Sequence, residues 1–293
     1  MKSNLFSLII IASVFSCNNS SNRDGVVEAQ FAKYWYQGKA EINVFELKQM
    51  RYGEAREGKA VMIFVTEDFS KRKQIKLDDP SEAGADAQKV LKLNMTREFV
   101  TGIYPYHSML SVFTPVFEDV NSPKINVSMT EWCGQAFSQM NWKNNGYQTQ
   151  IFSYFESEGD QEFKISGKSE DELFNLIRLN PDLIKEGEKE LIPSLVFQRF
   201  SHIQLKEETA VITKKVFGSA QAELEVNYPD LGRTLVIRYQ SKFPYEILSW
   251  QETQLTPKGE KEVTSAVRRR VQLLDYWNRN TSADKVLRES LKF

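Results

Sequence analysis

The chain has 293 residues, of which 41% are hydrophobic and 26% charged, a composition typical of a folded globular protein rather than of a disordered one. Its 38 basic and 39 acidic residues leave a net charge of −1, so no overall field favours nucleic acid and we expect no nucleic-acid partner. The two histidines and two cysteines are too few for a zinc or copper site, and the sequence has no glycine-rich phosphate loop. We therefore expect neither a metal nor a cofactor.

The chain begins with the pattern of an export signal. Lys2 supplies a positive charge, and residues 5–15 form an apolar run. This run is shorter than the roughly 20 residues that a membrane-spanning helix needs, but it has the length of a signal-peptide core. We therefore predict that residues 1–16 are a signal peptide.

The end of this segment has a cysteine in a characteristic setting. Residues 14–17 read Val-Phe-Ser-Cys, which resembles the lipobox of bacterial lipoproteins and implies cleavage before Cys17 and acylation of that cysteine. Polar residues follow, so residues 17–25 are predicted to be a lipidated, flexible tether. Several acyl chains anchor a protein permanently. The predicted location is thus the cell envelope, at the outer membrane and facing the periplasm; the alternative is an ordinary secretory peptide with an incidental cysteine.

The body of the chain, residues 26–293, is predicted to be a mainly β domain of the α+β class. A short helix is expected over residues 26–37, with Gly38 ending it in the position that glycine favours. Residues 60–65 are apolar at every position, which indicates a central strand that is covered on both faces.

Further strands are predicted where apolar and polar residues alternate, as is typical of half-buried strands. Asn145-Gly146, between residues 137–143 and 147–156, predicts a hairpin. Residues 263–273 also predict a strand, although their apolar residues fit helical spacing as well. The apolar positions of the other alternating segments are Leu91, Leu93, Met95, Ile125, Val127, Met129, Ala222, Leu224, Val226, Tyr228, Leu235, Ile237 and Tyr239.

Helices are expected to be few. Residues 169–172, Ser-Glu-Asp-Glu, form a capping box and predict a helix with one apolar face. Asn180-Pro181 predicts the start of a second short helix, and residues 281–291 predict a terminal one.

Together these elements predict a large antiparallel, strongly twisted sheet or half-open barrel of about a dozen strands. The sheet is either continuous or made of two related halves, residues 26–168 and 190–293, joined by helical residues 169–189. Residues 104–111 and 243–250 suggest an internal repeat, because in both an aromatic-Pro-Tyr turn joins two apolar-periodic strands. The alternative is one favourable hairpin turn that is used twice.

Four segments carry a family resemblance: residues 39–69, 104–116, 131–139 and 243–250. They resemble a family of uncharacterised Gram-negative lipoproteins, some of which carry a septum-formation-inhibitor label. The short acidic and basic motifs of the nucleotide pyrophosphatases that bear this name are missing here, so the label implies no activity. The aromatic-Pro-Tyr hairpin in a long meander also resembles, in architecture, half-open β-barrels that hold lipid in the periplasm.

Cys133 is the candidate nucleophile, and a nucleophilic thiol needs a base within hydrogen-bond reach. His107 is the candidate base and His202 is the other imidazole, but neither lies in a known catalytic pattern. The alternative for Cys133 is a small buried residue in a strand. No pair can be chosen among 39 scattered acids for a glycosidase. We therefore expect no catalytic site and no enzymatic activity.

The candidate ligand-binding residues are mostly aromatic. Arg269 lies on the same side of its strand as Val267 and Val271, and is interpreted either as an ion-paired residue at the sheet rim or as a contact for an anionic head group. The aromatic residues either line a cavity for an apolar ligand or pack in an ordinary core. They are Tyr104, Tyr106, Phe113, Trp132, Tyr245 and Trp250.

These features predict a membrane-anchored, non-catalytic binding module of the cell envelope. Its ligand is expected to be apolar or amphipathic, such as a lipid, and to lie in the concave face of the curved sheet. The alternative is a scaffold lipoprotein that docks another envelope protein through a sheet edge. An envelope enzyme that uses Cys133 is the third hypothesis.

Overall fold

The computed structural model describes residues 20–116 and 120–291 of the chain. The chain divides into two compact units, residues 1–37 and 38–293. The predicted signal peptide, residues 1–16, and the predicted lipidation site Cys17 lie outside the described residues. Within the described part of the chain, no helix is both long and apolar enough to cross a membrane.

The first unit contains helix α1 (Ser20–Trp35), which is longer than predicted. It begins six residues before the expected start, so residues 20–25 are helical rather than part of a flexible tether. Serine and asparagine disfavour a helix interior only weakly, so a helix formed by the residues that follow extends through them. Gly38 has φ +67°, the left-handed conformation expected of a glycine just past a helix.

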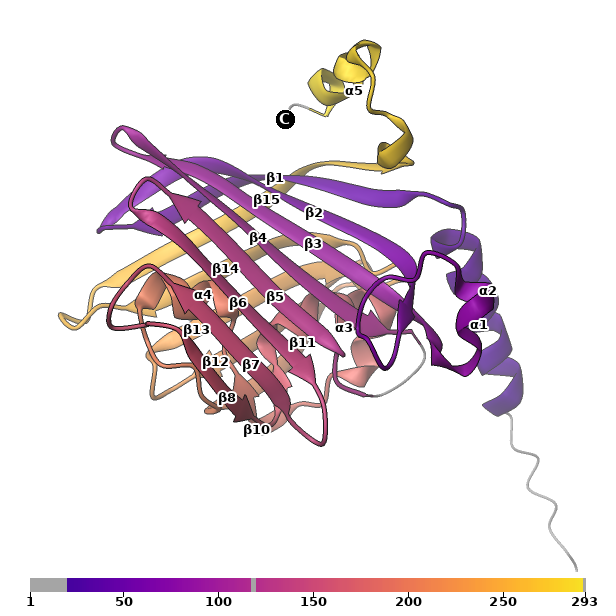
Figure 1. The fold of residues 1–293 in the computed structure, drawn as a ribbon, viewed down its shortest axis with the longest axis horizontal. Coiled ribbons are helices and arrows are strands. Elements are labelled where there is room, and N and C mark those ends of the chain that lie inside the picture. The colour runs from indigo at the N-terminus through magenta and orange to yellow at the C-terminus, as the bar shows by residue number, and fades with distance from the viewer. Residues whose placement is uncertain (1–19, 117–119, 292–293) are drawn as a thin grey trace, which may run out of the picture. The chain divides into compact units, whose positions relative to one another are not determined.

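The second unit contains one sheet of 15 strands in its described residues, as Figure 1 shows. The strands are β1 (Ala40–Arg51), β2 (Glu54–Ser70), β3 (Ala87–Thr101), β4 (Tyr104–Pro115), β5 (Lys124–Glu131), β6 (Gly134–Trp142), β7 (Tyr147–Ser153), β8 (Gln161–Ile165), β9 (Lys168–Ser169), β10 (Gly187–Ile192), β11 (Glu208–Phe217), β12 (Gln221–Tyr228), β13 (Arg233–Gln240), β14 (Ile247–Leu255) and β15 (Lys261–Leu274).

Short helices occupy connections between strands of this unit and the segment that follows β15. They are α2 (Pro80–Ala83), α3 (Leu173–Leu179), α4 (Leu195–Ser201) and α5 (Lys285–Ser290), with the 3₁₀ turns η1 (Gly84–Asp86), η2 (Glu170–Glu172), η3 (Pro181–Leu183), η4 (Tyr276–Asn278) and η5 (Ser282–Asp284).

The strand order confirms the predicted large antiparallel sheet. It runs β8-β7-β6-β5-β4-β3-β2-β1-β15-β14-β13-β12-β11-β10-β9, and every pair is antiparallel except β9 with β10. Neighbours in space are therefore neighbours in sequence everywhere except at β1 and β15, where Ala40 lies opposite Leu274. Strands β2–β8 lie on one side of β1 and strands β9–β15 on the other, and the pairing of β1 with β15 makes the sheet continuous.

The helical connection between the flanks lies against the inner face of the sheet. Figure 1 shows the sheet folding back on itself, with α3 and α4 between its front and rear strands. Asn175 of α3 donates from its side-chain amide to the carbonyls of Leu91 in β3 (3.0 Å) and Val112 in β4 (3.3 Å). The predicted capping box is confirmed, because the Ser169 side chain and Glu172 satisfy each other's backbone N–H groups at the start of η2.

The apolar run at residues 60–65 lies in β2, next to the middle of the sheet, as predicted. Ala60, Met62 and Phe64 face inward and are fully buried. Val61 and Ile63 face outward, beneath the C-terminal segment of residues 276–291 that carries η4, η5 and α5. The strand is therefore apolar on both faces because each face has its own cover.

The last predicted strand is confirmed as β15, but the valines that suggested it are not buried. Val267 and Val271 are 47% and 40% exposed, whereas Ala266 is fully buried. Ala266 lies opposite the buried Trp250 of β14, and a small residue is what fits beside that ring. The predicted alternation is also broken by a bulge at Arg269: Val267 lies opposite the exposed Glu46 and Val271 opposite the buried Asn43, so the two valines do not share a face.

The predicted hairpin joins β6 to β7, but its turn lies one residue earlier than expected. Asn144 and Asn145 have φ +52° and +61°, and Lys143 donates to the carbonyl of Gly146 at 2.8 Å. This is a two-residue turn with both central residues left-handed, which asparagine tolerates. Gly146 instead permits a close approach of β8, since a Cβ there would lie 2.5 Å from Cε of Lys164.

The two aromatic-Pro-Tyr segments are not structurally equivalent. Tyr104 and Pro105 are the first residues of β4, after a turn at residues 102–103. Phe243 and Pro244 lie in the turn between β13 and β14 and are joined by a cis peptide bond. The predicted repeat is therefore wrong for these two segments. Their sequences are similar, but the aromatic-Pro pair begins a strand in one segment and lies in a turn in the other.

Candidate functional site

The predicted aromatic residues do not form one cavity. Tyr104 lies beside Tyr106 and Trp132, with ring centroids 5.7 and 6.2 Å apart. Phe113 stacks on Phe69 at 4.8 Å on the outer face of the sheet. Tyr245 lies in the β13–β14 turn, where its ring contacts that of Phe243, 5.8 Å away.

Trp250 belongs to the inner core. It is 1% exposed and packs edge-on against Phe45 of β1, at 4.8 Å, and Phe174 of α3, at 6.1 Å. Of the predicted aromatic set, the structure therefore brings together only Tyr104, Tyr106 and Trp132.

The inner face, where the ligand was predicted to lie, is occupied by the protein's own side chains. Arg178 of α3 forms two hydrogen bonds with Glu41 of β1, and Arg233 of β13 forms two with Glu170 of η2. All four side chains are at most 3% exposed. The segment predicted only as a connector thus fills the concave face, because its apolar residues need cover that the curved sheet supplies.

A third ion pair continues this buried network. Arg97 of β3 donates to Glu252 of β14 at 2.7 Å, and Arg233 approaches the other oxygen of Glu252 at 3.8 Å. The positive charges of Arg97 and Arg233 lower the pKa of Glu252 against the opposing effect of burial. Of these buried pairs, Arg178–Glu41 and Arg233–Glu170 join the helical connection to the sheet, whereas Arg97–Glu252 joins two strands.

Cys133 does not occupy the buried strand position that was its alternative interpretation. It lies exposed in the turn between β5 and β6, beside Trp132. Its backbone N–H donates to the carboxylate of Glu131 at 2.6 Å, and hydrogen bonding to Glu131 raises the pKa of the thiol. The thiolate that nucleophilic catalysis requires is therefore disfavoured. His107, the candidate base, is exposed on β4 and lies opposite Thr130.

Arg269 forms an ion pair with Glu46 of β1, with its Nε 2.7 Å from the carboxylate. Both side chains are about half exposed, at 58% and 49%. This geometry agrees with the ion-paired interpretation of Arg269 at the sheet surface.

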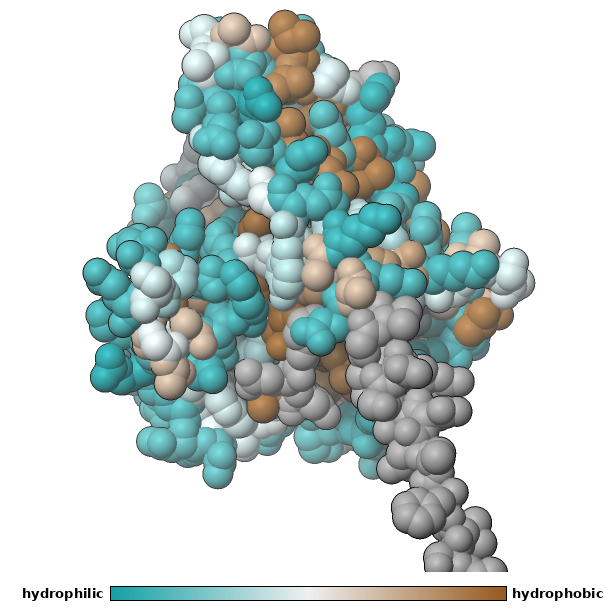
Figure 2. All heavy atoms as spheres, turned by 90° about the vertical axis from the view of Figure 1, so that its right-hand side faces the viewer, coloured by the Kyte–Doolittle hydropathy of each residue, from teal (hydrophilic) through white to brown (hydrophobic). Residues whose placement is uncertain are grey.

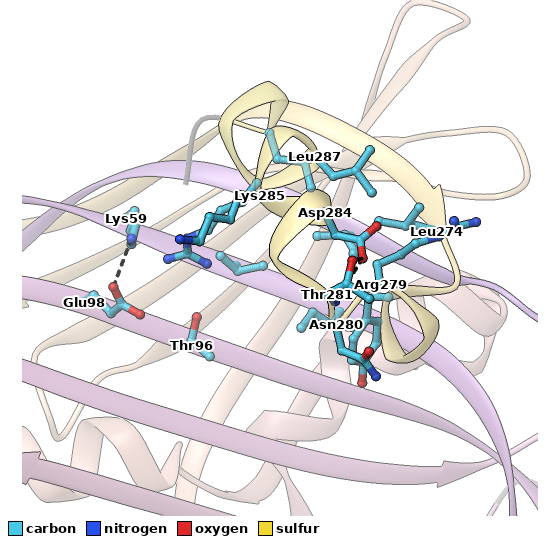
Figure 3. A pocket seen from close by; sticks show the side chains of 16 residues that line it. Lys59, Thr96, Glu98, Leu274, Arg279, Asn280, Thr281, Asp284, Lys285 and Leu287 are labelled. Atoms are coloured by element: carbon cyan, nitrogen blue, oxygen red, sulfur yellow. Dashed lines mark hydrogen bonds and ion pairs between the residues drawn. The ribbon is translucent and has the colours of Figure 1, made fainter.

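A pocket of about 480 Å³ lies on the outer face of the sheet, beneath the C-terminal segment. Figure 3 shows residues of β2 and β3 on one side of it and the C-terminal segment with Leu287 on the other. On the sheet side, Ile42, Val61 and Ile63 form the apolar part of the lining, beside Thr96 and the ion pair of Lys59 with Glu98. The covering side contributes Leu287 and Leu291, and Leu274 lies at the end of β15.

The start of the covering helix follows from its local sequence. Thr281 and Asp284 form a capping box that starts η5 and leads into α5. Hydrogen bonds from the side chain and backbone of Thr281 lower the pKa of Asp284. The helix then places Leu287 and Leu291, four residues apart, on one side, where both line the pocket.

The rim of the pocket carries more positive than negative side chains. Lys59, Arg279, Lys285 and Arg288 line it, against two carboxylates, Glu98 and Asp284. Lys59 pairs with Glu98 at 3.1 Å across β2 and β3, as drawn in Figure 3. An apolar interior with a cationic rim suits a molecule that has an apolar body and an anionic end.

Hydrophobic surface is also visible around this region. Figure 2 shows brown residues gathered in its upper part, at the height that the C-terminal segment occupies in Figure 1, with teal residues around them. Sequence reasoning missed the pocket because it looked for a ligand on the inner face. The sequence analysis predicted two features separately: a strand at residues 60–65 with two apolar faces, and a terminal helix. Taken together, they indicate that the helix covers the outer face of the strand, which is where the pocket lies.

Comparisons with known proteins give a distant structural likeness and no family. No family model and no curated protein matches the chain. Among solved structures, the chain is similar to a β-barrel-like protein of a domain of unknown function from Brucella abortus, with 7% sequence identity and a TM-score of 0.40. The alignment covers 80% of this chain and 97% of that one. The predicted membership of a lipoprotein family therefore stays a prediction.

Proposed function

We propose that the chain is a lipid-anchored, non-catalytic binding protein of the cell envelope that holds an amphipathic ligand between β1–β3 and the C-terminal segment. The observation that carries the proposal is the pocket there, with its apolar walls and its excess of cationic side chains at the rim. Its volume of about 480 Å³ is within the usual range of small-molecule sites, roughly 300–1,000 Å³.

The chemistry of the walls indicates which part of the ligand goes where. An acyl chain or other apolar body would pack between the side chains of β2 and α5, where its burial contributes about 25 cal/mol per Å². An anionic end would lie near Lys285 and Arg288, the cations on the covering helix. This is the ligand class predicted from the sequence, in a different place from the one predicted.

The predicted anchor supports the same function. Acylation at Cys17 would hold the binding domain beside the membrane that supplies its ligand. The raised pKa of the Cys133 thiol supports the non-catalytic part of the proposal. The expected location remains the outer membrane, on its periplasmic side.

The test is to identify lipid that co-purifies with the protein. Organic extraction releases bound lipid but leaves covalently attached acyl chains on the protein, so mass spectrometry of the extract reports the ligand alone. Ile63→Trp, which fills the pocket, is expected to abolish the bound lipid. Val267→Trp, on the same outer face but outside the pocket, is the matched control and is expected to retain it.

An extract without lipid from the unsubstituted protein would contradict the proposal. If a second protein co-purified instead, the scaffold hypothesis would replace it. Equal lipid content in Ile63→Trp and Val267→Trp would place the ligand elsewhere in the molecule.

A further inference from the structure

A second cavity, of about 310 Å³, lies on the outer face of strands β2–β5. Outward-facing residues of these four strands form its floor, and residues 74–76 of the connection between β2 and α2 complete its lining. The cavity shares no lining residue with the pocket beneath the C-terminal segment. The two sites can therefore be tested independently of each other.

The floor of this cavity belongs to a row of uncharged hydrogen-bonding side chains that crosses five strands. Its members, here called the polar row, lie directly opposite one another in β3 to β7 and are Asn94, Ser111, Asn126, Gln139 and Gln150. Successive members are one strand apart, or about 4.8 Å. On the other flank, by contrast, outward-facing Glu223 of β12 and Arg238 of β13 form an ion pair at 2.8 Å. The polar row is therefore a feature of this flank rather than of the outer face as a whole.

Hydrogen bonds hold several of these side chains in place. Ser111 donates to Oδ1 of Asn94 at 2.8 Å, and Gln139 donates to Oδ1 of Asn141 at 2.7 Å. Asn141 in turn donates to Oε1 of the buried Gln74 at 2.7 Å, and Gln74 donates to the last carbonyl of β6 at 2.6 Å. Side chains that are already ordered lose less conformational entropy when a ligand binds.

Two other side chains of the lining have no polar partner. Within the described residues, neither the amide of Asn126 nor the ammonium group of Lys124 forms a hydrogen bond or an ion pair. Lys124 is partly buried, and burial lowers the pKa of its ammonium group. Lys92, also in the floor, is paired with Glu67 at 2.5 Å, whereas Lys76 adds a positive charge from the β2–α2 connection. The cavity therefore presents a free amide and an excess of positive charge.

We propose that this cavity binds an acidic sugar, a hydroxylated ring that carries a carboxylate, and that the rest of the oligosaccharide lies along the polar row. A sugar hydroxyl both donates and accepts hydrogen bonds, and an amide side chain likewise presents donors and an acceptor. The ring of Phe113, which stacks on Phe69, supplies apolar surface for the C–H groups of the sugar ring. The carboxylate pairs with Lys124 through a charge-assisted hydrogen bond.

Other classes of ligand fit this surface less well. An acyl chain would cover the amides of Asn94 and Asn126 without offering them a hydrogen bond, which costs free energy. A nucleic acid binds mainly through many cationic side chains, and the polar row contains none. An oligosaccharide is narrow and carries hydroxyl groups along its whole length, as a row of amides across five strands requires.

Two hexasaccharides that differ only at carbon 6 test the proposal: β-1,4-linked mannuronic acid, which has a carboxylate there, and β-1,4-linked mannose, which has a hydroxymethyl group. In isothermal titration calorimetry, the mannuronate hexamer is expected to bind about tenfold more tightly than the mannose hexamer. Lys124→Gln is expected to abolish this difference and to leave the affinity for the mannose hexamer unchanged. Asn126→Ala is expected to weaken the binding of both hexamers.

Lys215→Gln is the matched control, because it removes an exposed lysine of β11 outside the cavity. This variant is expected to bind both hexamers as the unsubstituted protein does. Neither Lys124 nor Asn126 makes a polar contact in the fold, so both variants are expected to unfold at the temperature of the unsubstituted protein.

Three results would overturn the proposal. The first is that the mannuronate hexamer does not bind. The second is an equal loss of its binding in Lys124→Gln and Lys215→Gln, which would indicate attraction to positive charge in general. The third is unchanged binding of the mannuronate hexamer by Asn126→Ala together with its displacement by inorganic phosphate, which would leave a simple anion site without recognition of a sugar.

Discussion

Glu41 in β1 and Arg178 in α3, 137 residues apart in sequence, form a two-point ion pair with Nη1–Oε1 and Nη2–Oε2 distances of 2.5 and 2.7 Å. Both side chains are completely buried. The pair ties the helical connection to the strand at the centre of the sheet, and Asn43 donates a further hydrogen bond to Glu41 at 2.7 Å.

Removing one partner of this pair is expected to be strongly destabilising. Arg178→Ala would leave the Glu41 carboxylate buried without its counter-ion, which costs about 3–5 kcal/mol of unfolding free energy. The double variant Glu41→Leu/Arg178→Met removes both charges and is expected to recover most of that loss. Urea denaturation measures both. A single variant as stable as the unsubstituted protein would show that the pair does not hold α3 in place.

The stability of the protein is expected to fall as pH rises from about 4 to 7, because of Asp171. Burial raises the pKa of this carboxyl from its usual 3.8 to about 7. Between these values the folded protein keeps the proton and the unfolded chain has lost it, so each pH unit lowers the unfolding free energy by about 1.4 kcal/mol.

Asp171→Asn isolates this contribution. The amide oxygen can still accept the hydrogen bond from the backbone N–H of Leu195, which the carboxylate accepts at 3.0 Å. The variant is expected to match the unsubstituted protein near pH 4 and to exceed it in stability by a few kcal/mol at pH 8. Parallel stability profiles for the two proteins, measured by urea titration across this range, would contradict the prediction.

The β6–β7 turn is expected to depend on the tolerance of asparagine for positive φ. Asn144→Ala places alanine, which disfavours positive φ more than asparagine does, at φ +52°. The change is expected to lower the free energy of unfolding by about 1–2 kcal/mol. Asn144→Gly is the matched control and is expected to leave stability nearly unchanged, since glycine adopts this conformation freely. Thermal unfolding of the two variants compares them. Equal losses would mean that the asparagine side chain, rather than its backbone, is what matters.

The predicted lipidation at Cys17 has a direct consequence for localisation. Cys17→Ala cannot be acylated, so the variant is expected to partition into the soluble fraction of the envelope while the unsubstituted protein pellets with membranes. Labelling with a radioactive fatty acid checks the modification itself. If both proteins partition alike and neither takes up label, the lipobox interpretation is wrong.

Local structure followed closely from the sequence by itself. Alternation at residues such as Leu91, Leu93 and Met95 predicted the strands, because side chains on a strand point to opposite faces in turn. The Ser169–Glu172 capping box predicted the start of the inner helices, because both of its hydrogen bonds lie within four residues. The position of the β6–β7 turn was predicted to within one residue, because a two-residue turn also depends on neighbouring residues only.

Tertiary structure decided which face of each element is covered, and by what. Alternation predicted that Val267 and Val271 share a side of β15, but in the pairing with β1 a bulge at Arg269 places them on opposite faces of the sheet. The pocket needs β2 and α5, which are about 220 residues apart in sequence and meet only because the chain folds back over the outer face. Periodicity is a local property of the chain, whereas burial depends on contacts between distant segments, so strands and caps were readable from the sequence and the site was not.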